Sequence, residues 1–160
     1  MNKLFRLDGK TVVLTGAAGR LGSRFAHILC ESGANVILVD KDAKKNLKLK
    51  LELSKKYNVI TEVFDIDIIN ESSVEQMVKK IIKKFKKIDI LINNAHFVPR
   101  EHPKRDFPFE KYPLDLWNET INTNLQGLFL CSREIGKVMV KQNHGVIINI
   151  SSIYGVVGAD

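Results

Sequence analysis

The chain has few of the residues that mark specialised classes of protein. Its 160 residues include only two cysteines, four prolines and one tryptophan, and no apolar run approaches the roughly 20 residues of a membrane span. Two distant cysteines, Cys30 and Cys131, argue against a disulfide framework or a metal knuckle and predict reduced, buried thiols. Because residues 1–10 are charged and lack the apolar segment of a secretory signal, we expect a cytoplasmic protein.

What is present is the balance of one globular domain. Hydrophobic residues make up 44% of the chain and charged residues 27%, which argues against wholesale disorder. The net charge of +7 suggests an anionic partner, but the lysines concentrate in stretches 41–56 and 79–87, where charge alternates with apolar residues at helical spacing. We interpret both stretches as solvated helix faces. Nucleic-acid binding is the weaker alternative, because no recognised motif or aromatic stacking run accompanies the lysines.

Short apolar runs alternate with longer amphipathic ones. The predicted strands are 11–15, 35–39, 59–66, 88–92 and 145–150, and the predicted helices are 21–32, 42–57, 71–86 and most of 114–141. Asn70 or Ser72 is the expected cap of the third helix. This alternation predicts an α/β fold with three layers and a doubly wound, Rossmann-type parallel sheet. The long loop 96–113, which holds all four prolines, is expected to rim a functional site.

A glycine-rich turn follows the first strand. It reads Thr15-Gly16-Ala17-Ala18-Gly19-Arg20-Leu21-Gly22 and precedes the first helix. Glycine permits a tight turn and lets a phosphate approach the backbone, while the N-terminus of the helix offers free N–H groups to a pyrophosphate. An ordinary turn is the alternative, but the position directly after an apolar strand favours dinucleotide binding. The candidate cofactor residues here are Gly16, Gly19, Arg20, Leu21 and Gly22.

An acidic residue ends the second strand. Asp40 follows Gly22 by 18 residues, close to the spacing of about 20 at which the dinucleotide fingerprint places a carboxylate that binds the adenosine ribose. A carboxylate would repel a 2′-phosphate, which favours NAD over NADP, although Lys41 and Arg20 soften that preference. Capping of the following helix is the alternative role for Asp40.

In order and spacing, these segments and several later ones resemble the short-chain dehydrogenase/reductase family. The matching segments are Thr15 to Gly22, Asp40, Asp65, Asn93-Asn94-Ala95, Asn124 and Ser151-Ser152. The likeness extends from Leu7 to Gly158, and only the combined set is specific. It implies strand order 3-2-1-4-5 and an NAD(P)-dependent oxidoreductase. Such an enzyme moves a hydride between nicotinamide and a small-molecule alcohol or carbonyl compound.

The resemblance also implies roles for cofactor-binding residues. Gly16, Gly22 and the loop backbone would hold the pyrophosphate, and Arg20, which replaces the family's middle glycine, could reach a phosphate. Asp40 would bind the adenosine ribose. The remaining cofactor residues flank the rest of the coenzyme: Asp65 and Ile66 at the adenine, and Asn93 and Ala95 beside the nicotinamide ribose, where the triplet 93–95 would also brace the sheet.

The catalytic residues implied by the resemblance are Asn124 and Ser152. Asn124 would organise a proton-relay water, with stabilisation of a helix kink as the alternative. Ser152 would polarise the substrate oxygen as charge develops on it, while Ser151 is assigned a structural hydrogen bond. The pattern includes no metal site.

The family's Tyr-x-x-x-Lys is missing from the sequence. The three tyrosines, Tyr57, Tyr112 and Tyr154, are each followed four residues later by a residue other than lysine. We therefore expect residues 1–160 to form an NAD(P)-binding Rossmann domain that is incomplete at its C-terminus. A catalytically silent dinucleotide-binding module or a degenerate remnant is the alternative. In such a chain the fifth strand would be an unpaired apolar edge, which predicts marginal stability or association of copies.

Overall fold

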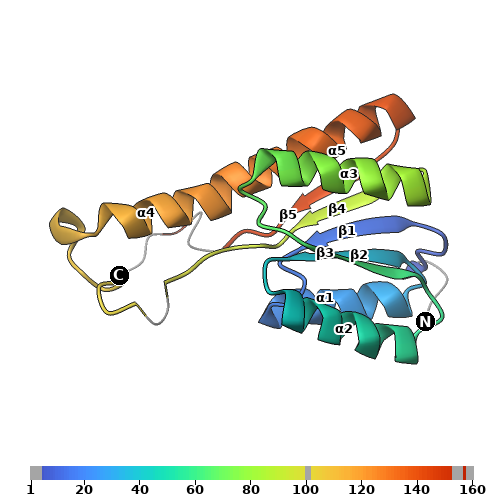
Figure 1. Ribbon diagram of the computed structural model, residues 1–160, viewed down its shortest axis with the longest axis horizontal. Coiled ribbons are helices and arrows are strands. Elements are labelled where there is room, and N and C mark those ends of the chain that lie inside the picture. Colours follow the sequence, from blue (N-terminus) through green and yellow to red (C-terminus); the bar gives the residue numbers. More distant parts are fainter. Residues whose placement is uncertain (1–4, 100–101, 153–156, 158–160) are drawn as a thin grey trace.

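The computed structural model describes residues 5–99, 102–152 and 157. Within these residues five parallel strands form one sheet in the order β3-β2-β1-β4-β5 (Figure 1). The strands are β1 (Thr11–Thr15), β2 (Asn35–Asp40), β3 (Thr61–Asp65), β4 (Ile90–Asn93) and β5 (Val146–Asn149). The predicted doubly wound α/β fold and its strand order are confirmed.

Helices cover both faces of the sheet and give the predicted three layers. On one face lie α1 (Arg20–Glu31) and α2 (Ala43–Lys56), and on the other lie α3 (Glu71–Phe85) and α5 (Leu128–Gln142) (Figure 1). The short 3-10 turn η2 (Phe109–Lys111) precedes α4 (Leu114–Ile121). A π-helical segment, η3 (Asn122–Gly127), joins α4 to α5. The predicted helix 114–141 is thus one long helix that projects beyond the sheet and changes its winding midway.

The apolar side chains of the central strands alternate between two cores. Val12 and Leu14 of β1 pack with α1 and α2, whereas Val13 packs with α3 and α5. All five residues of β1 are buried, as expected for a parallel strand covered on both faces. β5 differs, because all four of its residues are exposed. Among the described residues β5 pairs only with β4, so it forms the apolar edge that the sequence predicts.

The helix ends that face the carboxyl edge of the sheet differ in their caps. Asp42 caps α2 by accepting a hydrogen bond from the backbone N–H of Lys45 at 3.0 Å, and Asn70 caps α3 through Ser73 at 3.0 Å. The N-terminus of α1 at Gly19 has no side-chain cap. The first N–H groups of α1 therefore keep their capacity to bind an anion.

Asp89 ties together the opposite, amino ends of the strands. Its buried carboxylate accepts hydrogen bonds from the Thr11 N–H at 2.9 Å and from Lys10 at 3.2 Å, and it pairs with Lys87 at 3.1 Å and His144 at 3.5 Å. Burial acts to raise the pKa of Asp89, but the hydrogen bonds from Thr11 and the two lysines outweigh burial and lower it.

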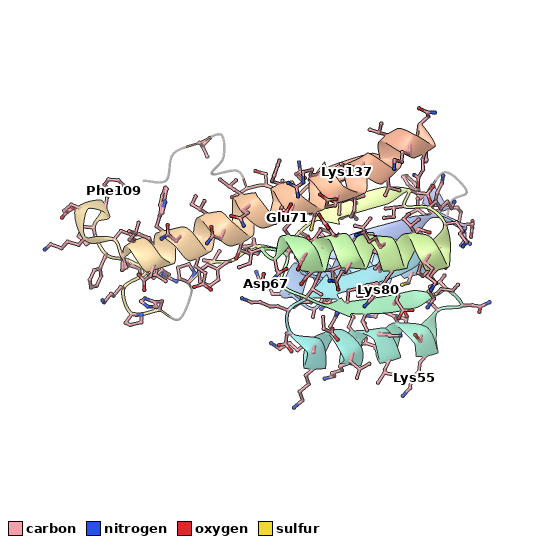
Figure 2. All side chains as sticks on the ribbon, turned by 45° about the horizontal axis from the view of Figure 1, so that its top comes forward. Lys55, Asp67, Glu71, Lys80, Phe109 and Lys137 are labelled. Atoms are coloured by element: carbon pink, nitrogen blue, oxygen red, sulfur yellow. The ribbon has the colours of Figure 1, made fainter. Side chains whose placement is uncertain are left out.

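Two surface and core properties also follow the sequence. Lys55 and Lys80 lie on the outward faces of α2 and α3 (Figure 2), so these lysines occupy solvated helix faces. Cys30 and Cys131 are buried free thiols, and burial raises the pKa of each to about 12. In the described part of the chain, no helix has the length and apolar character needed to cross a bilayer.

Candidate functional site

A cleft of about 840 Å³ opens at the carboxyl ends of β1, β2 and β4. This is the switch point of the sheet, where successive crossovers leave in opposite directions, and ligands of open α/β sheets bind at such points. The cleft is lined by the glycine-rich turn, the first turns of α1, the residues after β2, the segments that follow β3 and β4, and Thr123.

The glycines of the turn are required by close backbone packing. Gly16 has φ of +63°, and a Cβ there would lie 2.7 Å from the Cα of Ala95. A Cβ on Gly22 would lie 2.1 Å from the carbonyl oxygen of Gly16. The first turn of α1 can therefore approach the end of β1 only when position 22 carries no side chain.

The N–H groups of the turn are occupied within the protein. Ala17 donates to the Val39 carbonyl at 3.2 Å, and Gly19 donates to the Gly16 carbonyl at 3.2 Å. Ala18 donates to Oδ2 of Asp40 at 2.9 Å. The N–H groups at residues 17–19 are therefore not available to a ligand. The N–H groups that face a ligand are those of residues 20–22, in the uncapped first turn of α1.

Asp40 lines the cleft, and backbone groups engage both of its carboxylate oxygens. Its Oδ1 accepts from the Asp42 N–H at 3.0 Å, while its Oδ2 holds Ala18. The residue that caps α2 is Asp42, so the alternative role of Asp40 as the cap of that helix is wrong. The cleft is also lined by the cationic side chains of Arg20, Arg24 and Lys41.

Asn94 joins β4 to the glycine-rich turn. Its side-chain amide donates to the carbonyls of Thr15 at 3.0 Å and Gly16 at 3.1 Å. In return, Thr15 Oγ1 accepts from the backbone N–H groups of Asn94 and Ala95, both at 3.1 Å. The triplet 93–95 thus braces the sheet at the floor of the cleft.

The predicted cofactor residues fall into two groups. Those that line the cleft are Gly16, Gly19, Arg20, Leu21, Gly22, Asp40, Ile66 and Ala95. Asp65 and Asn93 are outside the lining and serve neighbouring elements. Asp65 accepts from the buried Asn46 amide at 3.0 Å, whereas Asn93 donates to Ser132 and to Asn149, both at 2.9 Å.

Asn124 lies within the π-helical segment and holds the loop after β4. Its amide oxygen accepts from the Phe97 N–H at 2.7 Å, and its amide nitrogen donates to the Phe97 carbonyl at 3.0 Å. Phe97 itself lines the cleft. Asn124 and Ser152 are outside the lining residues, and Tyr154 lies outside the described residues.

The first residues of the predicted loop 96–113 line the cleft. His96 and Val98 line the cleft itself. A neighbouring hollow of about 510 Å³ lies between this loop and α4, with His102, Leu116 and Glu119 in its wall. The loop therefore separates the main cleft from a second space that opens beside it.

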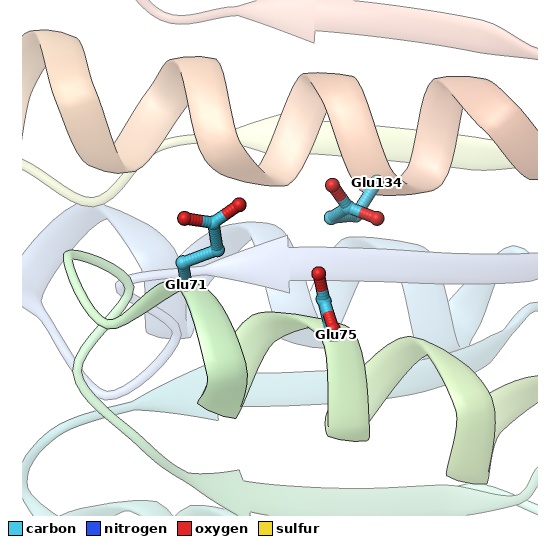
Figure 3. Close-up of side chains that lie close together, drawn as sticks. All are labelled: Glu71, Glu75 and Glu134. Carbon is cyan, nitrogen blue, oxygen red and sulfur yellow. The ribbon is translucent and has the colours of Figure 1, made fainter.

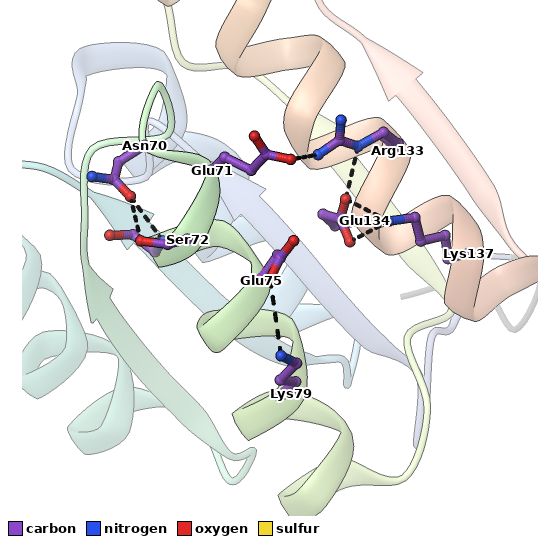
Figure 4. Close-up of polar contacts among 9 residues, drawn as sticks. Asn70, Glu71, Ser72, Glu75, Lys79, Arg133, Glu134 and Lys137 are labelled. Carbon is purple, nitrogen blue, oxygen red and sulfur yellow. Dashed lines mark hydrogen bonds and ion pairs between the residues drawn. The ribbon is translucent and has the colours of Figure 1, made fainter.

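Three carboxylates also gather away from the cleft, on α3 and α5. Glu71, Glu75 and Glu134 bring ligand-type oxygens within 4.8 Å of one another (Figure 3). Cations meet each of them (Figure 4): Arg133 bridges Glu71 and Glu134, Lys137 contacts Glu134 at 2.8 Å, and Lys79 lies 3.9 Å from Glu75. The Lys137 hydrogen bond lowers the pKa of Glu134. The cluster is an ion-pair network that joins the two helices.

Several lining residues were missed by the sequence reasoning. Arg24 lies one helical turn after Arg20, so helical spacing is the signal that could have found it. Asp42 and Lys45 form an ion pair at 2.8 Å beside Asp40, with the spacing of a helix cap. Thr123 comes from the distant π-helical segment, and no local sequence pattern points to it.

A match to a known protein family covers almost the whole chain. A family model described as "short chain dehydrogenase" matches residues 10–160. The chain belongs to the short-chain dehydrogenase family. Its curated relatives in this family are reductases and dehydrogenases. The 3-oxoacyl-[acyl-carrier-protein] reductase FabG of Thermotoga maritima is 29% identical over 96% of this chain and 59% of its own length. The NAD-dependent glycerol dehydrogenase of Listeria innocua is 32% identical over 99% of this chain and 59% of its own.

Solved structures of this family share the fold. An NAD⁺-bound xylitol dehydrogenase superposes with a TM-score of 0.86 at 30% identity, covering 95% of this chain and 56% of the other. A 7α-hydroxysteroid dehydrogenase complexed with NADH and 7-oxo glycochenodeoxycholic acid superposes with a TM-score of 0.86 at 27% identity. The match covers 99% of this chain and 60% of the other. This short-chain dehydrogenase sequence thus spans 59% of the length of each of the two curated relatives named above.

Proposed function

We propose that residues 1–160 form the NAD-binding domain of an oxidoreductase that moves a hydride between nicotinamide and a small-molecule alcohol or ketone. The observation that carries the proposal is the pairing, in one cleft, of the uncapped N-terminus of α1 with the carboxylate of Asp40. These two groups complement the two parts of an adenosine diphosphate: its pyrophosphate and its ribose diol.

The residues present fit such a coenzyme. Because α1 has no side-chain cap, its first N–H groups are open to a pyrophosphate, and Arg20 adds a positive charge beside them. Ile66 offers an apolar wall to the adenine. Asp40 favours a free ribose diol over a 2′-phosphate, and therefore NAD over NADP, because two negative groups would repel each other there. Bound nicotinamide would donate or accept the hydride.

Two further residues are assigned to the substrate end of the site. Ser152 would donate its hydroxyl hydrogen to the substrate oxygen and stabilise the charge that grows on it. Asn124 would organise a proton-relay water at this end of the site. Its two hydrogen bonds to Phe97 also hold the π-helical segment against the loop after β4. π-Helical turns often occur at functional sites because they displace side chains from regular helical positions.

A silent dinucleotide-binding module is the second candidate. It is favoured by the cleft, whose lining holds the predicted coenzyme-binding residues but neither Asn124 nor Ser152. Both candidates predict coenzyme binding, and they differ in turnover. An enzyme would oxidise or reduce members of a panel of alcohols and ketones, whereas the module would bind without turnover.

The cellular setting and the assembly are part of the proposal. Two buried free thiols suit the reducing cytoplasm. The exposed, uncharged strand β5 pairs only with β4 among the described residues, so it would favour association of copies of this 160-residue chain, since unpaired apolar edges recruit further strands. Analytical ultracentrifugation would reveal that association as a mass that rises with protein concentration.

Titration with NADH and NADPH tests the proposal. We expect saturable NADH binding, followed by nicotinamide fluorescence, and at least about tenfold weaker binding of NADPH, equivalent to about 1.4 kcal/mol. Absence of NADH binding at millimolar concentration would overturn the proposed function. Equal affinities would overturn the NAD preference alone.

A further inference from the structure

The carboxylate of Asp40 connects two loops that both line the cleft, one after β1 and one after β2. Its Oδ2 holds the N–H of Ala18 in the glycine-rich turn, at 2.9 Å. Its Oδ1 holds the N–H of Asp42, the cap of α2, at 3.0 Å. Both oxygens are thus engaged by backbone groups before any ligand is present.

The N–H groups of Ala17, Ala18 and Gly19 each donate one of the described hydrogen bonds. Of these three bonds, only that of Ala18 has a side chain as its acceptor. Ala17 and Gly19 donate to backbone carbonyls, which no substitution at position 40 removes. Without the Asp40 contact, the N–H of Ala18 would lose its acceptor. The turn would then be held by the bonds of Ala17 and Gly19 and by the Asn94 amide, with none at Ala18. A partly buried donor without an acceptor costs enough free energy to favour another conformation.

We propose that Asp40 is a positioning residue for the phosphate half of the ligand: it holds the glycine-rich turn so that the first N–H groups of α1 face the cleft. This inference rests on the proposed function and adds a second role to the carboxylate that faces the ribose. It means that Asp40 contributes to the binding of a group that it does not contact.

The two roles predict opposite effects on a ligand that has no ribose. If Asp40 served the ribose alone, its removal would strengthen the binding of inorganic pyrophosphate, because a negative charge would leave the cleft. If Asp40 also holds the turn, its removal weakens pyrophosphate binding despite the gain in positive potential. The sign of the change therefore separates the two accounts.

The test compares Asp40→Ala with Asp67→Ala. Asp67 is an exposed carboxylate that also lines the cleft, and it follows β3 (Figure 2). Among the described contacts, its side chain accepts a hydrogen bond only from the N–H of Ile69. Its removal subtracts the same charge without touching the turn. The affinity of each protein for pyrophosphate would be measured by calorimetry and by competition with NADH. Exchange of the Ala17, Ala18 and Gly19 amides would be followed by NMR.

We expect Asp40→Ala to bind pyrophosphate about tenfold more weakly, the effect of losing one hydrogen bond to a charged group. Its three turn amides should exchange faster, whereas Asp67→Ala should bind pyrophosphate as tightly as the parent or more tightly. Equal or tighter pyrophosphate binding by Asp40→Ala, together with weaker NADH binding, would overturn the positioning role and leave the proposed function intact. A parent protein that binds neither ligand would overturn both.

A second variant covers the case in which Asp40→Ala does not fold. Asp40→Asn keeps the volume of the side chain but replaces one of the two oxygens with an NH2 group, which cannot accept from the N–H that bonded to that oxygen. The amide of Ala18 or of Asp42 must then exchange faster than in the parent. Unchanged exchange at both amides would overturn the proposal.

Discussion

Replacing Gly22 with alanine should disrupt the site, because the added methyl group would clash with the backbone of the glycine-rich turn. The new Cβ would lie 2.1 Å from the Gly16 carbonyl oxygen and 2.9 Å from the Cα of Ala17. Both are backbone atoms, so no side-chain rotation relieves the clash. An ordinary contact of at least 3.4 Å requires the turn and the helix to separate by more than 1 Å.

That separation would break contacts that fix the turn. The hydrogen bond of Ala17 to Val39 and that of Asn94 to Gly16 both depend on the present position of the loop. With about 1 kcal/mol for each hydrogen bond, and a further about 1 kcal/mol for residual overpacking, we expect a loss of about 3 kcal/mol in the free energy of unfolding. The anion-binding N–H groups would be displaced with the helix, so NADH affinity should fall by about 100-fold or more.

Gly136→Ala is the matched control. Gly136 also lies in a helix, α5, but a Cβ there would meet nothing within 4 Å. Since alanine is the better helix former, this variant should gain about 0.5–1 kcal/mol. Urea unfolding would measure both stabilities, and nicotinamide fluorescence both affinities. If Gly22→Ala were as stable as the parent and bound NADH equally well, the packing described for this turn would be refuted.

Three further predictions concern the rest of the molecule. Because the folded-state pKa of Asp89 is lowered, its contribution to stability is complete above about pH 4 and is lost as the pH falls through the lowered pKa. Asp89→Asn should therefore cost about 1–2 kcal/mol in urea unfolding at pH 7 and progressively less as the pH is lowered below 4, and a cost independent of pH would contradict this. Asn70→Ala should remove the cap of α3 and cost about 1 kcal/mol, measured by thermal unfolding; no change would show that Ser73 does not need the cap. Cys30 and Cys131, with pKa values raised to about 12, should resist an aromatic disulfide reagent until the protein is unfolded, and rapid labelling of the native protein would disprove their burial.

The layers and the strand order could be predicted because local patterns and crossover rules agree. Buried parallel strands give continuous apolar runs such as 11–15, and amphipathic spacing gives the helices between them. The strand ends differ from the prediction by at most two residues. The predicted strand 88–92, for example, is observed as Ile90–Asn93, since pairing begins only where neighbouring strands lie alongside. The π-helical winding at Asn122–Gly127 has no signal in apolar periodicity.

The candidate site was predictable where its residues follow one another along the chain. Gly16, Gly22 and Asp40 are found from strand ends and spacing, because parallel strands bring their carboxyl ends to one edge. Spacing does not reveal which backbone N–H groups are already bonded. The turn's own donors are occupied, and the ligand-facing donors lie one step later, in α1. Asp65 was placed at the adenine by resemblance alone, whereas its oxygen binds Asn46.

The central claim is that the N-terminus of α1 and Asp40 together bind a nicotinamide dinucleotide. Backbone amide NMR of the protein during titration with NADH tests it most directly. The account predicts saturable shifts that are largest at residues 18–22 and 40–42, on both walls of the cleft, with little change at the amino ends of the strands around Asp89. Shifts centred elsewhere, or none at saturating NADH, would contradict it.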